Sequence, residues 1–246
     1  MSIAQKAKKK IDQWPDSKVF RLQDFDDYKE SPKAVSETLS RLTKQGAIVR
    51  FSKGRFYKPK ATRYGNVRPG QDAFVEAFLY RSNRKKKERV AYITGASLFY
   101  EWGLTTQIPS RVQIASTEGS FDQNIKGIRI SAKKSNVDKL NENRVLVLQI
   151  LDIVKSFKTI PEADPENIVK VLKRYIETFN NTSIRDAERI ALKYYRPSVQ
   201  ALLGALMEDS LNYKSKKLKD NLSPLSQYRM GVNSEIIKSA ENWQLH

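Results

Sequence analysis

The apolar residues at the start of the chain recur at helical spacing. Ile3, Ala7, Ile11 and Trp14 lie three or four residues apart, so they share one face of a helix. Ser2, of a residue type that caps helix N-termini, precedes the segment, and a proline follows it. The pattern predicts a first helix from residue 3 to residue 14.

A second amphipathic helix is predicted over residues 32–45, after a short strand at residues 19–22. Ser31 suits the N-cap, Pro32 suits the first helical position, and Gly46 suits the left-handed residue that ends a helix. At about 100° per residue, one narrow stripe of this helix is apolar: Val35, Leu39 and Leu42. The opposite side and its flanks are polar or charged: Lys33, Ser36, Glu37, Ser40, Arg41 and Lys44.

The next segment has the pattern of a β-hairpin. Residues 47–51 and 55–58 read as two strands on either side of Ser52-Lys53-Gly54, and Gly54 supplies the positive φ that a tight turn needs. A helix, a glycine and a two-stranded ribbon with a basic tip together predict a winged helix-turn-helix over residues 1–60.

This module has the residue types of a DNA reader. Short hydroxyls and long cations on the 32–45 helix suit base edges and phosphates in a major groove. Lys53 and Arg55 on the 47–58 wing suit the backbone or the minor groove, and further phosphate contacts are expected from four cations: Arg50, Lys58, Lys60 and Arg63. Two plainer interpretations remain open, an ordinary amphipathic surface helix and a basic hairpin tip that is only solvated.

The rest of the chain predicts an α+β fold that becomes mostly helical. Residues 61–70, rich in Pro, Gly and Arg, read as a linker to a second domain at 71–212. The second domain opens with a helix at 71–80, followed by a basic run at 81–89, read as a solvated loop or a phosphate contact. Three short strands are predicted at 90–93, 111–115 and 127–132, with a short helix at 95–102 after the first of them. Longer helices are predicted at 145–157, from residue 164, from a capping box at 183–186, and at 197–206.

Two pieces of this second half carry specific expectations. The strands at 111–115 and 127–132 are expected to pair across Glu118-Gly119 and the residues after it. Residues 213–246 are expected to be a basic extension, either an arm that orders on DNA or an ordinary surface segment.

The charge supports a polyanionic partner. The chain has 45 Lys and Arg against 27 Asp and Glu, a net charge of +18. Residues 1–70 hold 17 of the former and 7 of the latter, a net +10, so the excess is concentrated in the predicted DNA-binding module. An anionic membrane surface comes second to nucleic acid, and a charge that only gives solubility remains an alternative.

Little in the sequence points to catalysis. The chain has no cysteine, which excludes disulfides and thiolate metal sites, and its single histidine, His246, is its last residue. A phosphate loop ending in Gly-Lys-Ser/Thr and a Glu-x-Lys tripeptide are both absent, and the most apolar run, 145–154, is too short to cross a bilayer. We therefore expect a cytoplasmic, nucleoid-associated protein that is not an enzyme and needs no metal or cofactor.

The sequence also resembles a known family. The order of residues in the module, followed by two further motifs and weaker matches downstream, resembles AbiEi-type antitoxins of bacterial type IV toxin–antitoxin (abortive infection) systems. The matching segments are 24–25, 34–35, 39–42, 46, 48–50, 53–57, 59–60, 93–98, 102–109, 202–206 and 221–225. The resemblance covers most of the chain, and its motifs are structural rather than catalytic.

The resemblance implies a repressor of its own operon that also counteracts a toxin. It implies double-stranded operator DNA as a partner, and a functional partner that is a nucleotidyltransferase-like toxin, without a stable complex being required. If the operator is an inverted repeat, two copies would bind it as a dimer. Two other classes stay open: a winged-helix interaction or scaffold protein without sequence-specific DNA binding, and a DNA-processing enzyme.

Overall fold

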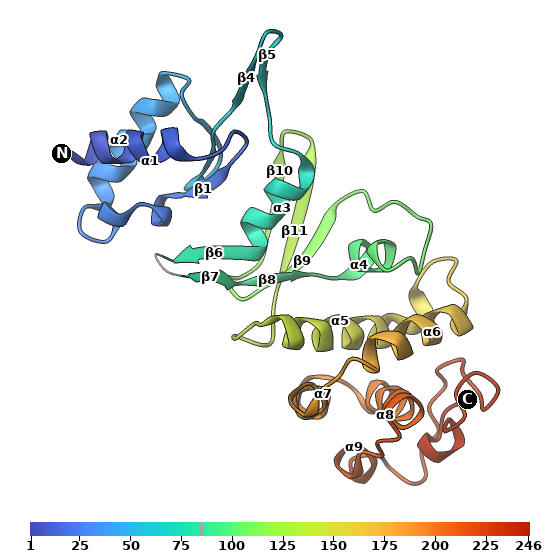
Figure 1. Ribbon diagram of the computed structural model, residues 1–246. Coiled ribbons are helices and arrows are strands. Elements are labelled where there is room, and N and C mark those ends of the chain that lie inside the picture. Colours follow the sequence, from blue (N-terminus) through green and yellow to red (C-terminus); the bar gives the residue numbers. More distant parts are fainter. Residues whose placement is uncertain (84–85) are drawn as a thin grey trace.

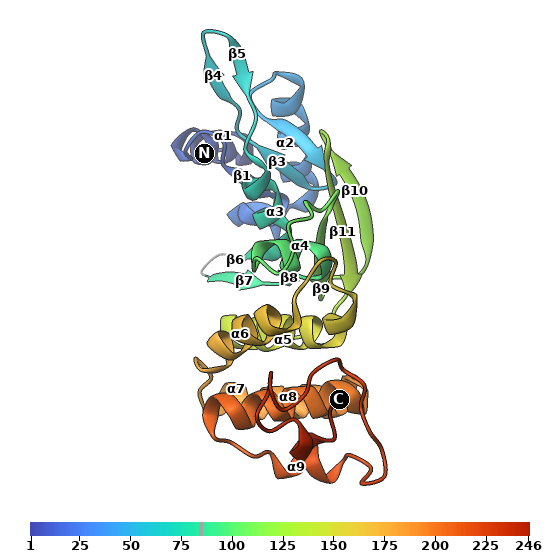
Figure 2. The same cartoon turned by 90° about the vertical axis from the view of Figure 1, so that its right-hand side faces the viewer.

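The protein has an elongated α+β fold (Figure 1). The computed structural model describes residues 1–83 and 86–246. An N-terminal helical module, a four-stranded sheet and a bundle of C-terminal helices follow one another along the long axis (Figure 2). The predicted α+β class with a mostly helical C-terminal part is confirmed.

The N-terminal module combines two helices with a small antiparallel sheet. Its elements are α1 (Ile3–Gln13), β1 (Val19–Arg21), the 3-10 helices η1 (Leu22–Asp24) and η2 (Asp26–Tyr28), α2 (Pro32–Lys44), β2 (Val49–Ser52) and β3 (Arg55–Tyr57). The sheet has the order β1-β3-β2. A core of its own holds the module together, with Phe20, Leu39 and Ile48 at its centre.

Local signals account for most of the ends of these elements. Ser2 caps α1 in a reciprocal capping box with Gln5. Gly46 and Gly54 have φ values of +74° and +69°, as the end of α2 and the hairpin turn require. Ser31 is at the N-cap of α2 as predicted, but its side chain makes no capping hydrogen bond, so Pro32 is the stronger start signal.

A hairpin stands where a linker was predicted. β4 (Lys60–Thr62) and β5 (Gly65–Val67) pair antiparallel across most of this stretch, and no further strand of the described residues joins them. The hairpin projects from the end of the molecule that also holds the C-terminal part of α2, in both views (Figures 1 and 2). The connection between the two parts of the chain is therefore structured.

The central sheet has the order β10-β11-β9-β8. The elements of this part are α3 (Gln71–Leu79), β6 (Tyr80–Asn83), β7 (Lys86–Arg89), β8 (Ala91–Ile93), α4 (Gly95–Glu101), β9 (Val112–Ser116), β10 (Phe121–Ile125) and β11 (Ile128–Lys134). The two strands predicted to pair, β9 and β11, are neighbours, but they run parallel. The unpredicted strand β10 lies between them in the sequence and pairs with β11 as a hairpin.

The two faces of this sheet belong to different cores. Successive side chains of a strand point to opposite faces, and Ile114 packs with α3 and the β2–β3 hairpin whereas Ala115 packs with the C-terminal helices. Tyr57 of β3 lies in the first of these cores, against Phe74 at 5.7 Å between ring centroids. The N-terminal module is thereby packed onto the sheet through its hairpin, and α2 stays on the far side.

The C-terminal helices form the largest core. They are α5 (Glu142–Ser156), the 3-10 helix η3 (Phe157–Thr159), α6 (Pro165–Ile176), α7 (Asn181–Tyr194), α8 (Pro197–Leu211), α9 (Lys216–Asp220) and the 3-10 helix η4 (Glu241–Trp243). The capping box predicted at 183–186 is wrong: the N-cap of α7 is Asn180, three residues before Ser183, because Asn180 accepts hydrogen bonds from the backbone N–H groups of Thr182 and Ser183. None of the helices in the described ranges is long and apolar enough to cross a membrane.

The predicted basic extension at 213–246 is not an arm. Trp243 is fully buried, and its indole lies so close to Gly204 that a Cβ at that position would overlap the ring. The indole Nε1 donates to Glu208 at 2.7 Å, and Leu218 and Ile237 are also fully buried. This segment is part of the helical core, because the burial of its apolar residues stabilises it there although it begins with several lysines.

Candidate nucleic-acid interface

The outward face of α2 is the largest set of predicted site residues that the structure brings together. The six side chains predicted to read bases and phosphates are all exposed: Lys33, Ser36, Glu37, Ser40, Arg41 and Lys44. Within the described part of the chain, no hydrogen bond or ion pair engages any of these side chains. The second half of the chain does not cover this face (Figure 1).

The buried side of α2 fixes the direction of that face. Val35 and Leu39 are fully buried and Leu42 is nearly so, as the apolar stripe predicts. Thr38 is also buried between them, which the apolar pattern alone does not identify. Since the helix packs on α1 and on the module's core, its polar face is presented by a rigid element.

The tip of the β2–β3 hairpin is packed against the rest of the molecule. The Ser52 hydroxyl donates to Gln123 of β10 at 2.9 Å, and the Leu22 N–H donates to the Gly54 carbonyl at 3.2 Å. Lys53 is the exposed residue of this turn. The predicted wing therefore offers one cation at its tip rather than a free basic ribbon.

Arg55 does not belong to the DNA-facing set. Its guanidinium lies 4.1 Å from the ring centroid of Phe78 and 4.0 Å from Glu118, and its side chain is 15% exposed. Burial and the neighbouring Arg21 lower the pKa of Arg55 to about 10, although Glu118 opposes this shift. Arg55 fastens the hairpin to the central part of the chain, because β3 turns it inward.

Lys58 is also occupied inside the module. Its Nζ donates to the carbonyls of Trp14 at 2.8 Å and Asp12 at 3.2 Å, at the C-terminal end of α1. A cation there donates hydrogen bonds to carbonyls that the helix leaves unpaired, and it interacts favourably with the negative end of the helix dipole. The predicted phosphate contact is thus replaced by a cap.

The remaining predicted cations are exposed, on two different elements. Arg50 lies on β2, while Lys60 and Arg63 lie on the β4–β5 hairpin. The guanidinium of Arg63 stacks over the ring of Tyr64, 4.7 Å from its centroid, at the tip of that hairpin. Tyr64 is 85% exposed.

Two further exposed cations, Arg68 and Lys126, lie at the base of the β4–β5 hairpin and were not predicted. Arg68 donates from Nη1 to the carbonyl of Lys126, at 2.5 Å, so the hairpin base is joined to the β10–β11 turn. The sequence does contain a signal for this region, because residues 59–70 hold three cations and no carboxylate.

The basic run at 81–89 is largely taken up by ion pairs. Arg81 donates to Glu118 at 2.9 Å, Lys87 pairs with Glu76, and Arg89 pairs with Glu142. Arg84 and Lys85 lie outside the described residues. Arg81, Lys87 and Arg89 thus hold the β6–β7 pair to its surroundings.

A buried carboxylate of the helical part, Asp152, has a structural explanation. Asp152 of α5 accepts hydrogen bonds from the hydroxyls of Tyr92, Thr94 and Tyr195, and Lys133 lies 3.8 Å away. Burial, followed by the charge of Asp152, raises the pKa of both tyrosines well above the ordinary value. Among the described residues, no group of three or more His, Cys, Asp or Glu side chains is placed to hold a metal ion.

Comparisons with known proteins place the chain in one family. A search of curated proteins finds no match to it. A family model described as a family of unknown function (DUF6088) matches residues 6–179, which include the N-terminal module, the β4–β5 hairpin and the central sheet. The chain belongs to this family.

Proposed function

We propose that the protein is a sequence-specific DNA-binding regulator that reads a major groove with the outward face of α2. The observation that carries the proposal is that this face, with three cations and two hydroxyls, is exposed and has no side-chain partner among the described residues, although the chain has carboxylates elsewhere to pair the cations. A major groove about 12 Å wide admits one α-helix. Side chains at about one-turn spacing then reach neighbouring base pairs and phosphates.

The arrangement of the module supports a winged-helix interpretation. A helix, a strand, a short helical turn, a second long helix and a hairpin follow in order, and β1 pairs with the returning strand β3. In such modules the second long helix lies in the groove and the hairpin lies beside it. Lys53 is then a backbone contact, and Arg50 is a second one.

The test is binding of the full chain to duplex DNA, first to the region upstream of its own gene. If six to ten phosphates are neutralised, the affinity falls by about three to five decades between 50 and 200 mM salt. Arg41→Ala should cost about 1–3 kcal/mol on the preferred sequence and relax the preference at one position. Ser40→Ala should do the same at a neighbouring position, whereas Lys53→Ala should weaken all sequences alike.

The matched control is Arg185→Ala, which removes an exposed arginine from α7 at the other end of the molecule. This variant should bind as the unmodified protein does. Salt-insensitive binding, or an Arg41→Ala variant that keeps full affinity and preference, would contradict the proposed role of α2.

The resemblance to AbiEi-type antitoxins extends the proposal to the biological role. In that role the protein represses its own operon, as a dimer if the operator is an inverted repeat, and counteracts a nucleotidyltransferase-like toxin without catalysing a reaction. The N-terminal module supplies the DNA binding and the helical part the antitoxicity. Co-expression with the product of a neighbouring nucleotidyltransferase gene tests this: Arg41→Ala should release repression and leave protection from the toxin intact.

A further inference from the structure

The chain has two hairpins near α2, and they differ in what they leave free. The β2–β3 hairpin is packed through Ser52 and Arg55 onto β10 and α3. In the part of the chain that the structure describes, the β4–β5 hairpin has no partner strand beyond its own pair, and all three residues of β5 are exposed. The element that projects freely is therefore the second hairpin.

The second hairpin is built as a short ribbon with a charged tip. Three antiparallel pairs, from Lys60–Val67 to Thr62–Gly65, leave only Arg63 and Tyr64 in the turn. The turn is closed by the Thr62 hydroxyl, which donates to the Gly65 carbonyl at 2.7 Å, and Gly65 adopts a φ of +110°. The tip is thus ordered by local contacts, although Arg63 and Tyr64 are both exposed.

Charge and location both favour a nucleic-acid partner for this tip. Residues 59–70 carry three cations and no anion, and the β10–β11 turn adds Lys126 at the base. Projecting from the end that holds the C-terminal part of α2, the hairpin would reach the DNA next to the groove that this helix occupies (Figure 2).

We propose that the β4–β5 hairpin is a second DNA-binding arm, whose Arg63 side chain enters the minor groove flanking the site read by α2. The inference rests on the proposed DNA-binding function. The ribbon itself is too broad for a minor groove about 6 Å wide, but one arginine side chain is not. The guanidinium of Arg63 stacks over the ring of the exposed Tyr64, so both side chains lie together at the tip of the turn.

Arginine in the minor groove predicts a dependence on the flanking sequence. Narrow A·T-rich minor grooves have an enhanced negative potential that attracts arginine, without any base-specific hydrogen bond. The protein should therefore prefer A·T-rich flanks beside its site, and the preference should reside in Arg63.

The experiment uses duplexes that the full-length protein selects from a random library, remade with either A·T-rich or G·C-rich flanks. Arg63→Ala should lower the affinity by about tenfold on A·T-rich flanks and by about twofold on G·C-rich flanks, since only the former has the narrow groove. It should also reduce the salt slope by about one. Arg63→Lys should keep the salt slope and lose most of the flank preference, because an ammonium is more strongly hydrated than a guanidinium and enters a narrow groove less readily. Arg185→Ala should change neither.

The outcomes separate this inference from the function on which it rests. If the protein selects a sequence and Arg41→Ala relaxes it, while Arg63→Ala binds both flanks as the unmodified protein does, the arm is refuted and the role of α2 stands. An equal loss on both flanks also refutes the minor-groove contact. If the protein binds no duplex DNA, the proposed function fails, and the arm fails with it. Because the Arg63 side chain is exposed, unchanged thermal unfolding should accompany each variant.

Discussion

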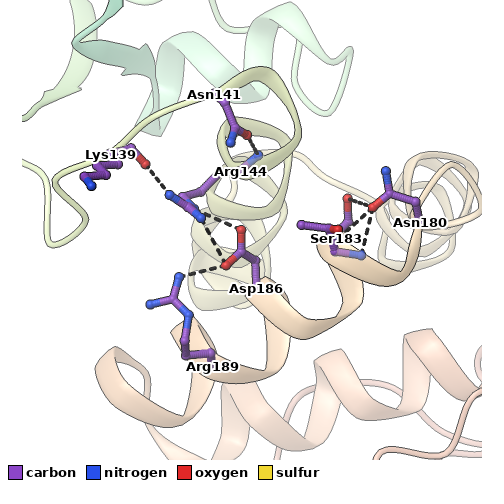
Figure 3. A network of polar contacts seen from close by, with 8 residues as sticks. Lys139, Asn141, Arg144, Asn180, Ser183, Asp186 and Arg189 are labelled. Atoms are coloured by element: carbon purple, nitrogen blue, oxygen red, sulfur yellow. Dashed lines mark hydrogen bonds and ion pairs between the residues drawn. The ribbon is translucent and has the colours of Figure 1, made fainter.

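Two sets of basic residues, on α2 and around the start of α7, show opposite patterns of pairing. On α2, Lys33, Arg41 and Lys44 are exposed and have no acidic partner among the described residues. At α7, Asp186 accepts from Arg144 of α5 at 2.9 Å and from Arg189 at 2.8 Å (Figure 3). One carboxylate thus holds two guanidinium groups, and it is itself buried.

The pairing in the helical part is repeated at other buried carboxylates. Asp209 accepts from Lys173 at 2.9 Å and from two backbone N–H groups, and Glu188 accepts from Ser215, with Lys217 at 3.4 Å. The same chain therefore pairs cations where they join helices and leaves them free on α2. This difference gives the first set a structural role, and it is the contrast on which the binding role proposed for the second set rests.

The largest expected effect comes from breaking the paired set. Arg144→Ala removes two hydrogen bonds to Asp186 and a third to the Lys139 carbonyl, leaving a buried carboxylate with the exposed Arg189 alone. We expect the free energy of unfolding to fall by about 3 kcal/mol, because the buried carboxylate loses its more buried partner and keeps only one that is exposed to solvent. Urea denaturation measures it.

Arg189→Ala is the matched control for that variant. Its side chain is 55% exposed, and Asp186 keeps both contacts to Arg144, so the loss should stay below about 1 kcal/mol. Equal losses for the two variants would show that the burial of the Arg144 contact does not matter.

The same carboxylates predict how stability depends on pH. Burial alone would raise the pKa of Asp186 and of Asp209, but hydrogen bonds from Arg189 and Arg144, and from Lys173 and Ser239, outweigh it and lower both values. A carboxyl whose pKa is lower in the folded state stabilises it above the unfolded-state pKa of about 3.9. This contribution is lost as the pH falls from there through the folded-state value.

Urea midpoints measured between pH 7 and pH 2.5 test this dependence. Asp186→Asn should be less stable than the unmodified protein at pH 6, and the difference should shrink as the pH falls below 4. A difference that stays constant over this range would exclude ionisation of Asp186 as its cause. The α2 variants should show no such pH dependence relative to the unmodified protein.

Much of the N-terminal module follows from local sequence, which explains why it was predictable. Pro32, the apolar stripe of α2, Gly46 and Gly54 each act within a few residues, and the structure has all of them in the expected places. The outward face of α2 follows from the same stripe. The class of the fold and most of the helices in the second half follow from periodicity in the same way.

The features that the sequence did not predict either depend on contacts with residues far away in the sequence or lie in exposed strands that lack an apolar face. The strands of the β4–β5 hairpin are almost entirely exposed and have no apolar face, so the sequence pattern of a half-buried strand is missing. The parallel pairing of β9 with β11 is a non-local contact, and the inward turn of Arg55 depends on Phe78 and Glu118. The lysine-rich beginning of residues 213–246 likewise led to the prediction of a basic extension, although later residues of this segment are buried.

Arg55 is the intermediate case, a cation of the predicted wing that the structure assigns to the paired set. Arg21, Arg55 and Arg81 all lie within 4.0 Å of the single carboxylate of Glu118. Arg55→Met removes one excess buried charge and keeps an apolar contact with Phe78, so the free energy of unfolding should change by less than about 1 kcal/mol. Affinity for DNA should stay within about twofold of the unmodified protein, since no phosphate contact is lost.

Binding measurements at two salt concentrations, with Lys53→Ala as the comparison, test this assignment. A loss of DNA affinity for Arg55→Met that matches the loss for Lys53→Ala would return Arg55 to the DNA-facing set. It would also mean that the β2–β3 hairpin leaves the central sheet when the protein binds.

The smallest expected effect on stability is at the centre of the proposed interface. Arg41→Gln removes an exposed charge that has no partner, apart from its favourable position in the last turn of α2. Such a position contributes about 0.3–1 kcal/mol at low salt, so the free energy of unfolding should fall by about 0.5 kcal/mol or less. Arg41→Gln should thus lower the affinity for DNA with little loss of stability, whereas Arg144→Ala should lower the stability and leave the α2 face intact. Measuring both variants in urea and on duplex DNA separates stability from binding. Loss of stability for Arg41→Gln as large as that for Arg144→Ala would show that α2 depends on a contact of this side chain, and the contrast between free and paired cations would no longer identify the interface.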